Sequence, residues 1–259
     1  MEEAAVAASA SAPAQVADRQ RRERRFYSYM ALAALAVVFI GFAPTYYLKT
    51  FGVVHFPRPG PDLNPTLMIH GLVFSLWVAL FVVQTQLVAA GRRDLHRSLG
   101  VAGFGLAIAM LPIMYWAVLD QTARGSAPPF TDPLTWSCVP LLGMPVYAIL
   151  LWLGWRARRT DLQAHKRLML GLMLMLTQPA TGRLPVVPPV LGGFVIQGLL
   201  TAALFVPLIV WDRRTRGKAH PATMTGALLY LMLLAAQTGF LATPGLWSAF
   251  AAQLPGMTP

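Results

Sequence analysis

Charged residues are scarce in this 259-residue chain, which also contains a single cysteine. Only 12% of its residues are charged, against about 25% in an ordinary soluble domain. A soluble protein of 28.2 kDa could not cover its surface with so few charges, which excludes a soluble enzyme. Cys138 alone allows neither an internal disulfide nor a metal site built from cysteines. The apolar content of 56% and the mean hydropathy of +0.55 exclude disorder and favour an all-α, polytopic membrane protein.

The motifs of several enzyme classes are missing as well. No His-Glu-x-x-His motif, Gly-x-Ser-x-Gly motif or phosphate-binding Walker loop occurs in the sequence. These absences count against hydrolases, kinases and the familiar redox enzymes. We assign no catalytic residue, and whether the protein is an enzyme stays open at this point.

Long apolar runs, by contrast, recur along the whole chain. A helix needs roughly 20 mostly apolar residues to cross a membrane. Seven stretches qualify, namely 26–48, 65–90, 98–119, 134–155, 168–184, 190–211 and 223–240. The fifth is the shortest, because Pro179 and Arg183 interrupt its outer end. We predict a disordered basic tail over residues 1–25, a seven-helix transmembrane domain over residues 26–243 and a short tail over residues 244–259.

Lysine and arginine are distributed very unevenly between the predicted loops. Only Lys49, Arg58, Arg124 and Arg183 lie on one side of the predicted spans. The 17 residues on the other side are Arg19, Arg21, Arg22, Arg24, Arg25, Arg92, Arg93, Arg97, Arg156, Arg158, Arg159, Lys166, Arg167, Arg213, Arg214, Arg216 and Lys218. Because basic loops stay in the cytoplasm, this predicts a cytoplasmic N-terminus and a periplasmic C-terminus in a bacterial inner membrane. The same loops explain the net charge of +11 without nucleic acid, and we expect them to bind anionic lipid headgroups.

Five short motifs follow one another between residues 41 and 185. They are GFAPTYYL (41–48), HGLVFSLW (70–77), DLHR (94–97), AHKRLML (164–170) and RLP (183–185). Together they resemble a widespread group of bacterial seven-helix integral membrane proteins to which no activity is assigned. More loosely, their order of His, His-Arg, His-Lys-Arg and Arg is similar to membrane families of unknown function that are suspected of haem or respiratory roles. The resemblance runs from about residue 25 to the end and implies the fold, but no site residue.

Three histidines stand at the starts of predicted helices on the basic side, at His96, His165 and His220. Each follows a basic turn with one aspartate, which suggests a repeated helix hairpin. The same pattern arises without a repeat, because membrane proteins in general carry basic loops on one side and because Asp94 and Asp161 can cap helices. If the three helices were adjacent, the histidines could hold Zn²⁺ or Fe²⁺ with one of these aspartates. The alternative is that they are interfacial residues.

Only two ionisable residues lie clearly below the predicted outer surface, His70 and Arg183. Such groups cost roughly 2.5–3.5 kcal/mol within a bilayer, so each needs an explanation. His70 lies about 7 Å down the second span at 1.5 Å per residue, and Arg183 lies near the outer end of the fifth span. We therefore expect both side chains at a similar depth in the outer half of the membrane.

Other polar and aromatic residues are predicted to share that depth or helix face. Trp77 lies on the same helical stripe as His70, while Gln178 and Gln237 reach the outer half on other spans. We predict a cofactor-binding or ligand-binding pocket formed by His70, Trp77, Gln178, Arg183 and Gln237. The alternatives are a packed histidine hydrogen-bonded to a neighbour and an arginine that extends to the headgroups.

The residue types of this pocket suit a redox or anionic ligand. A guanidinium binds two oxygens of a carboxylate, haem propionate or phosphate, and neutral imidazole is a common axial ligand of haem iron. A haem b with two axial ligands would need a second one, for which only His55 or a methionine such as Met114 is at hand.

Three functions therefore remain in view. The first is binding of haem b or a quinone-like ligand, in a respiratory or assembly context with partner proteins. The second is a small-solute or lipid transporter, against which the odd number of spans argues. The third is a membrane-embedded enzyme that acts on a lipophilic substrate.

Overall fold

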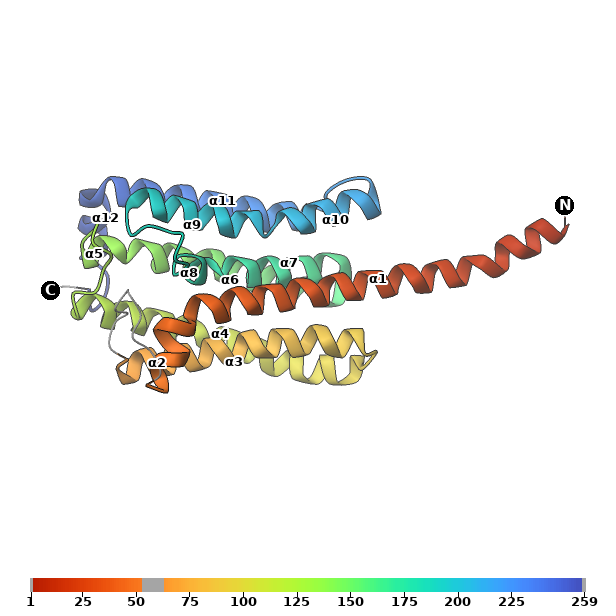
Figure 1. Cartoon of the computed structure of the whole chain (residues 1–259), viewed down its shortest axis with the longest axis horizontal. Helices are drawn as coiled ribbons and strands as arrows, with labels where there is room; N and C mark the ends of the chain where they lie inside the picture. Colours follow the sequence, from red (N-terminus) through yellow and green to blue (C-terminus); the bar gives the residue numbers. More distant parts are fainter. Residues whose placement is uncertain (1, 53–62, 258–259) are drawn as a thin grey trace.

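The computed structural model describes residues 2–52 and 63–257, with side chains from residue 15 onward, and every regular element in these ranges is helical (Figure 1). The longer helices run side by side along one axis. The elements are α1 (Glu2–Phe42), a π-helix (Ala43–Tyr47), α2 (Leu48–Thr50), α3 (Pro65–Ala89), α4 (Arg93–Ala123), α5 (Pro133–Trp136), α6 (Cys138–Thr160), α7 (Leu162–Met175), α8 (Gln178–Thr181), α9 (Leu191–Ala203), α10 (Val206–Arg216), α11 (Pro221–Ala242) and α12 (Pro244–Ala251).

Six helical segments in the described part of the chain are long and apolar enough to cross a membrane. They are Gln15–Thr50, Pro65–Ala89, Arg93–Ala123, Pro133–Thr160, Leu191–Arg216 and Pro221–Ala242. In each, only 17% to 39% of the most apolar window is buried inside the bundle, so most of this apolar surface faces outward. A soluble protein does not expose an apolar surface of this extent to water. The chain is therefore an all-α, multi-pass membrane protein.

The predicted fifth span, residues 168–184, is not among these six and differs from the prediction at both ends. α7 already begins at Leu162, where the Asp161 carboxylate accepts hydrogen bonds from the backbone N–H groups of Gln163 and Ala164, both at 2.9 Å. It ends at Met175, and only the short α8 follows before an irregular segment. Pro179 has no N–H group to continue the helical ladder, which explains the interruption.

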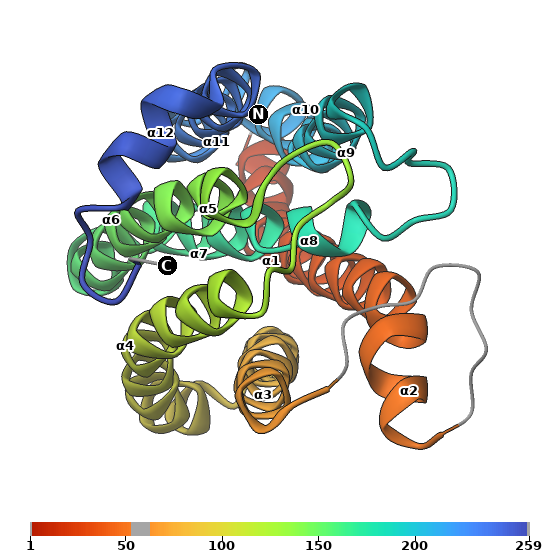
Figure 2. The same ribbon diagram turned by 90° about the vertical axis from the view of Figure 1, so that its left-hand side faces the viewer.

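α7 lies at the centre of the bundle, with α6 and α11 along it and α1 and α9 also in contact (Figure 2). Eight of its 14 residues are buried. Its crossing with α11 is close, since a Cβ atom at Gly171 would lie 3.7 Å from the Cα atom of Gly226. Small residues at a crossing let two helix backbones approach, which is how helices pack where no hydrophobic effect drives them together.

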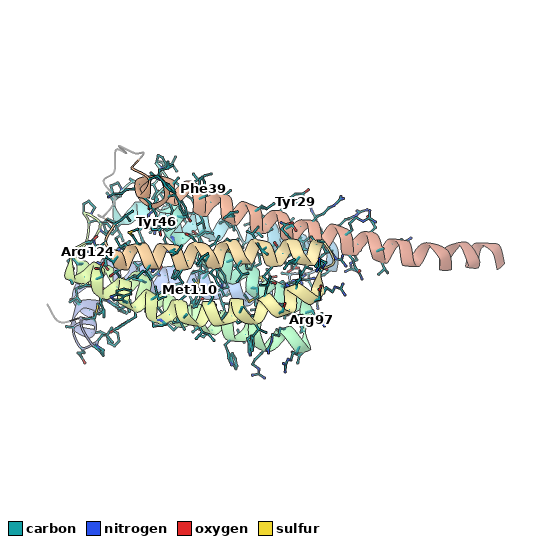
Figure 3. All side chains as sticks on the ribbon, turned by 90° about the horizontal axis from the view of Figure 1, so that it is seen from below. Tyr29, Phe39, Tyr46, Arg97, Met110 and Arg124 are labelled. Atoms are coloured by element: carbon teal, nitrogen blue, oxygen red, sulfur yellow. The ribbon has the colours of Figure 1, made fainter. Side chains whose placement is uncertain are left out.

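The turns between successive long helices alternate between the two ends of the bundle. The α3–α4, α6–α7 and α10–α11 turns lie at the end from which α1 projects (Figure 1). Arg97, near the start of α4, and Arg124, directly after its last residue, mark opposite ends (Figure 3). Gly91 and Gly217 form two of the turns with φ of +78°, a left-handed conformation that favours glycine.

Two terminal segments are more ordered than the composition predicts. Residues 15–25 are helical within α1, where we expected a disordered tail. The Arg22–Asp18 ion pair (2.6 Å), one turn apart, and the Lys166–Glu23 ion pair (2.5 Å) support this helix and join it to α7. In the predicted C-terminal tail, α12 packs on the bundle, and its buried Trp247 donates to the Ser137 hydroxyl at 3.0 Å.

The C-terminal end of α1 touches the backbone of α8 directly. A Cβ atom at Gly41 would overlap the backbone of Ala180, so no larger residue fits without moving one helix. Backbone atoms cannot rotate away as a side chain can. Gly41 therefore sets how closely α1 approaches the segment that carries Arg183.

We expect Gly41→Ala to lower the stability of the bundle by about 1–3 kcal/mol, because the added methyl group must displace one of the two helices. Thermal unfolding of the purified protein in detergent measures this loss. Gly105→Ala is the matched control, since a Cβ atom at Gly105 meets no other atom within 4 Å. Equal unfolding temperatures of the two variants would contradict the close α1–α8 contact.

Candidate functional site

The sequence predicts His70 and Arg183 at a similar depth. They come from α3 and from the segment after α8, and they are close enough to interact electrostatically. The start of α3 is fixed by Asn64, whose side chain accepts from the Leu67 N–H (2.9 Å) and donates to Asp120 at the end of α4 (2.6 Å). This N-cap places His70 in the second turn of α3.

Arg183 is held by neutral groups. Its Nε donates to the hydroxyl of Thr45 at 3.2 Å, and its Nη1 donates to the carbonyl of Pro179 at 2.7 Å. The guanidinium carbon lies 4.4 Å from the centre of the Phe42 ring, a cation–π contact. No acidic residue of the described ranges pairs with it. The positive charge of Arg183 is therefore oriented but not neutralised.

The π-helix at the end of α1 forms one wall of this site. Pro44 falls at its start, and such single-turn π segments are frequent at functional sites. Tyr46 donates to the carbonyl of Met68 at 2.9 Å, and its ring lies against the glycine that follows His70 (Figure 3). The hydroxyl of Tyr47 lies 2.9 Å from that of Ser75. These contacts hold the end of α1 on α3 both before and after His70.

The imidazole of His70 lacks a partner. Its ring stacks on Phe74 with centroids 4.2 Å apart, and its Nδ1 is buried with no hydrogen-bond partner among the described residues. A buried nitrogen left in this state costs about 1–3 kcal/mol. We call the group formed by Thr45, Tyr46, His70 and Arg183 the outer site, after the half of the membrane in which the sequence predicts it.

The other predicted pocket residues, Trp77, Gln178 and Gln237, make contacts with residues of their own surroundings. Trp77 is 3% exposed and stacks on Phe81 in the core, about two turns further along α3 than His70. Gln178 donates to Gln237 at 3.1 Å, and Gln237 donates to the carbonyl of Val139 at 2.8 Å. These buried amides satisfy each other and join α8, α11 and α6. This bonding stabilises the bundle.

The three histidines of the basic end do not form a metal site. Within the described residues, no group of three histidine, cysteine or acidic side chains could hold a metal ion. His165 Nδ1 lies 2.9 Å from the Gly154 carbonyl in the preceding helix, and His220 Nδ1 accepts from the Ala222 N–H at 3.1 Å. His96 instead lies against Gln84, whose amide nitrogen donates to its Nδ1. Each of the three histidines thus forms a hydrogen bond with a nearby residue.

Sequence reasoning missed a buried ion pair at the same end. Arg167 (1% exposed) and Asp212 (0%) lie 2.5 Å apart at their closest atoms, joining α7 to α10. Asp212 also accepts from the His220 N–H at 3.0 Å and from the Thr223 hydroxyl at 2.6 Å. The signal in the sequence was the register, since Arg167 shares a helix face with buried leucines and Asp212 follows the buried Leu208 by four residues.

His220 belongs to this cluster as the N-cap of α11. Burial lowers the pKa of its imidazole, and the nearby Arg167 and Arg216 lower it further. The neutral ring is also the form that can accept the Ala222 N–H. The folded protein therefore favours unprotonated His220.

Comparison with known proteins yields no relative of this chain: no family model, curated protein or solved structure matches it. A function must be argued from the geometry of the outer site and its surroundings.

We expect Asp212→Asn to destabilise the protein by about 3–5 kcal/mol, because it leaves the Arg167 charge buried without its partner. Thermal unfolding in detergent measures the loss. Asp94→Asn is the control, because Asp94 is an exposed aspartate at the start of another helix of the same end, and it should unfold like the wild type. If both variants unfold alike, the buried pair does not fix the α7–α10 contact.

We also expect a pH dependence that involves His220. Its contribution is complete above the unfolded-state pKa of about 6.5 and declines as the pH falls below it, since the unfolded chain then binds a proton that the folded chain does not. His220→Asn keeps an N-cap acceptor without the titration. The unfolding temperature of the wild type should drop more than that of the variant between about pH 7 and about pH 5. Parallel curves would count against this role.

Proposed function

We propose that this chain is a seven-span protein of a bacterial inner membrane that binds a lipid-soluble ligand of quinone type at the outer site, with His70 and Arg183 as its polar contacts. The N-terminus would lie in the cytoplasm and the C-terminus in the periplasm. The gathering of the basic turns and the start of α1 at one end of the bundle supports this orientation.

The seventh span in this proposal is the segment formed by α7 and α8. The 14 residues of α7 extend about 21 Å at 1.5 Å per residue, and α8 with the irregular segment that follows would cover the remaining depth. Irregular backbone is tolerated at membrane depth only where protein surrounds it. The break between α7 and α8 meets that condition, because α7 lies at the centre of the bundle and Thr177, Gln178 and Ala180 around the break are buried.

The observation that carries the ligand proposal is the unpartnered, buried Nδ1 of His70 beside an arginine whose charge is not neutralised. A ligand oxygen between the two side chains would supply the missing partner of the imidazole and accept from the guanidinium. Carbonyl, phenolate and carboxylate oxygens satisfy this pair. A quinone head group carries such a carbonyl oxygen, and its reduction places negative charge there, which a nearby arginine stabilises.

The surroundings of His70 favour a ligand that arrives from the lipid. Met68, Ile69 and Leu72, its neighbours on α3, are 42% to 56% exposed on the apolar outer face of the bundle. A lipophilic tail can lie along this face while the head group reaches the polar pair. A small polar solute would gain nothing from such a surface.

The residues present fit haem b less well. A haem with two axial ligands needs a second donor at the depth of His70, and the other described histidines lie at the opposite end. Met114 is buried on α4, 9% exposed, and His55 lies outside the described residues. Arginine beside the imidazole suits a haem propionate as well as a quinone oxygen, so the missing second axial ligand is what counts against haem b.

Decylubiquinone titrated into the full-length protein in lipid nanodiscs tests the proposal, with quenching of tryptophan fluorescence as the readout. We expect saturable binding, which His70→Ala and Arg183→Gln each weaken by at least about tenfold, because each removes one polar contact worth about 1.4 kcal/mol. His96→Ala, at the other end of the bundle, is the matched control and should bind like the wild type.

Two results would contradict the proposal. One is the absence of saturable binding in the wild type, and the other is equal binding by His70→Ala in a protein that remains folded by circular dichroism. A Soret absorption band in the purified wild type that disappears in His70→Ala would replace the quinone with haem b.

A further inference from the structure

A second polar site lies at the opposite end of the bundle. An open cleft of about 650 Å³ lies between the first part of α1, the start of α7 and the end of α10. Its charged lining residues are Asp18, Arg19, Arg22, Glu23, Arg167 and Arg216. This volume falls within the range of about 300–1,000 Å³ that small-molecule sites occupy.

Four of these six charged residues already have a partner inside or outside the cleft. Arg22 pairs with Asp18 at 2.6 Å, Glu23 pairs with Lys166 at 2.5 Å, and the buried Arg167 pairs with Asp212. All these pairs are locally neutral. They shape the cleft without setting its net charge.

The remaining two cations keep their charge. Arg19 donates to the backbone carbonyl of Thr215 at 3.2 Å, a bond that orients the guanidinium but does not neutralise it. Arg216 is exposed, and no ion pair joins it to an acidic residue of the described part of the chain. The two arginines approach the cleft from different helices, α1 and α10. Two such planar groups suit the oxygens of one phosphate.

An aromatic residue of the lining adds a further donor. Trp211 stacks on Phe26 with ring centroids 4.4 Å apart, and its buried indole N–H has no acceptor among the described residues. Tryptophan is typical of the headgroup region of a membrane, where one edge is apolar and the other polar. The cleft thus lies where apolar and cationic surfaces of the protein meet.

We propose that this cleft binds the phosphate group of an anionic phospholipid, with Arg19 and Arg216 as the charged contacts. The outer surface of α1 continues from it as an apolar track, since Tyr29 and Leu32 are 68% and 43% exposed and Tyr29 projects away from the bundle (Figure 3). Acyl chains can follow this track while the headgroup remains in the cleft. The proposal rests on the membrane location alone and not on the outer site.

Native mass spectrometry of the full chain in mild detergent tests it, with phosphatidylglycerol and phosphatidylcholine as probes. We expect phosphatidylglycerol to bind at least about tenfold more tightly, and Arg19→Gln/Arg216→Gln to remove most of that difference. Arg213→Gln/Arg214→Gln is the matched control, because it removes the same charge from exposed residues outside the cleft. It should retain the preference.

A third probe, glycerol 3-phosphate, separates a lipid from a soluble phosphate. If it competes with phosphatidylglycerol only weakly, the acyl chains contribute and the lipid is the ligand. If it binds as tightly as the lipid, the cleft recognises a soluble phosphate and the lipid proposal fails. Equal losses in the two double variants would also overturn the proposal, since the preference would then follow total charge. Should the Arg19→Gln/Arg216→Gln protein not fold, the single exposed substitution Arg216→Gln gives the same comparison against Arg214→Gln.

Discussion

One buried carboxylate, that of Asp212, joins three helices at the basic end of the bundle. It accepts hydrogen bonds from the Arg167 guanidinium in α7. It also accepts from the N–H of His220 and the hydroxyl of Thr223, which joins it to the start of α11. A charge so far from water is tolerated only when its pairing is complete. The pairing therefore admits one register of α7 against α10 and α11, and a shift of one residue would break several bonds at once.

The register of α7 at the basic end also affects the outer site, because α7 connects the two. A helix of 14 residues is close to rigid. The position of its start in the bundle therefore fixes the position of its end, and of Pro179 in the segment that follows. Beyond this point, Gly41 and Ala180 bring α1 against α8, and Arg183 comes to lie between Phe42 and Thr45. The geometry at the outer end thus follows from an ion pair at the other end of the same helix.

Sequence reasoning performed well where depth along a helix was the deciding quantity. Run lengths predicted the six long apolar helices, and His70 and Arg183, for which counting residues predicts a similar depth, interact electrostatically. Depth says nothing about direction around the bundle axis, however. Gln178 and Gln237 therefore met each other rather than His70, and Arg167 was taken for one more basic loop residue although it points into the core.

Arg167 in α7 and Arg183 just after α8 show how the same side chain takes different roles. Arg167 has a carboxylate at 2.5 Å and further hydrogen bonds to Gln163, so its charge and its donors are used within the protein. Arg183 is held by a hydroxyl, a carbonyl and an aromatic ring, none of which carries a negative charge. A guanidinium at membrane depth is stable when an anion or a strong acceptor lies beside it. Since the neighbouring imidazole also lacks a partner, one ligand oxygen would complete both groups together.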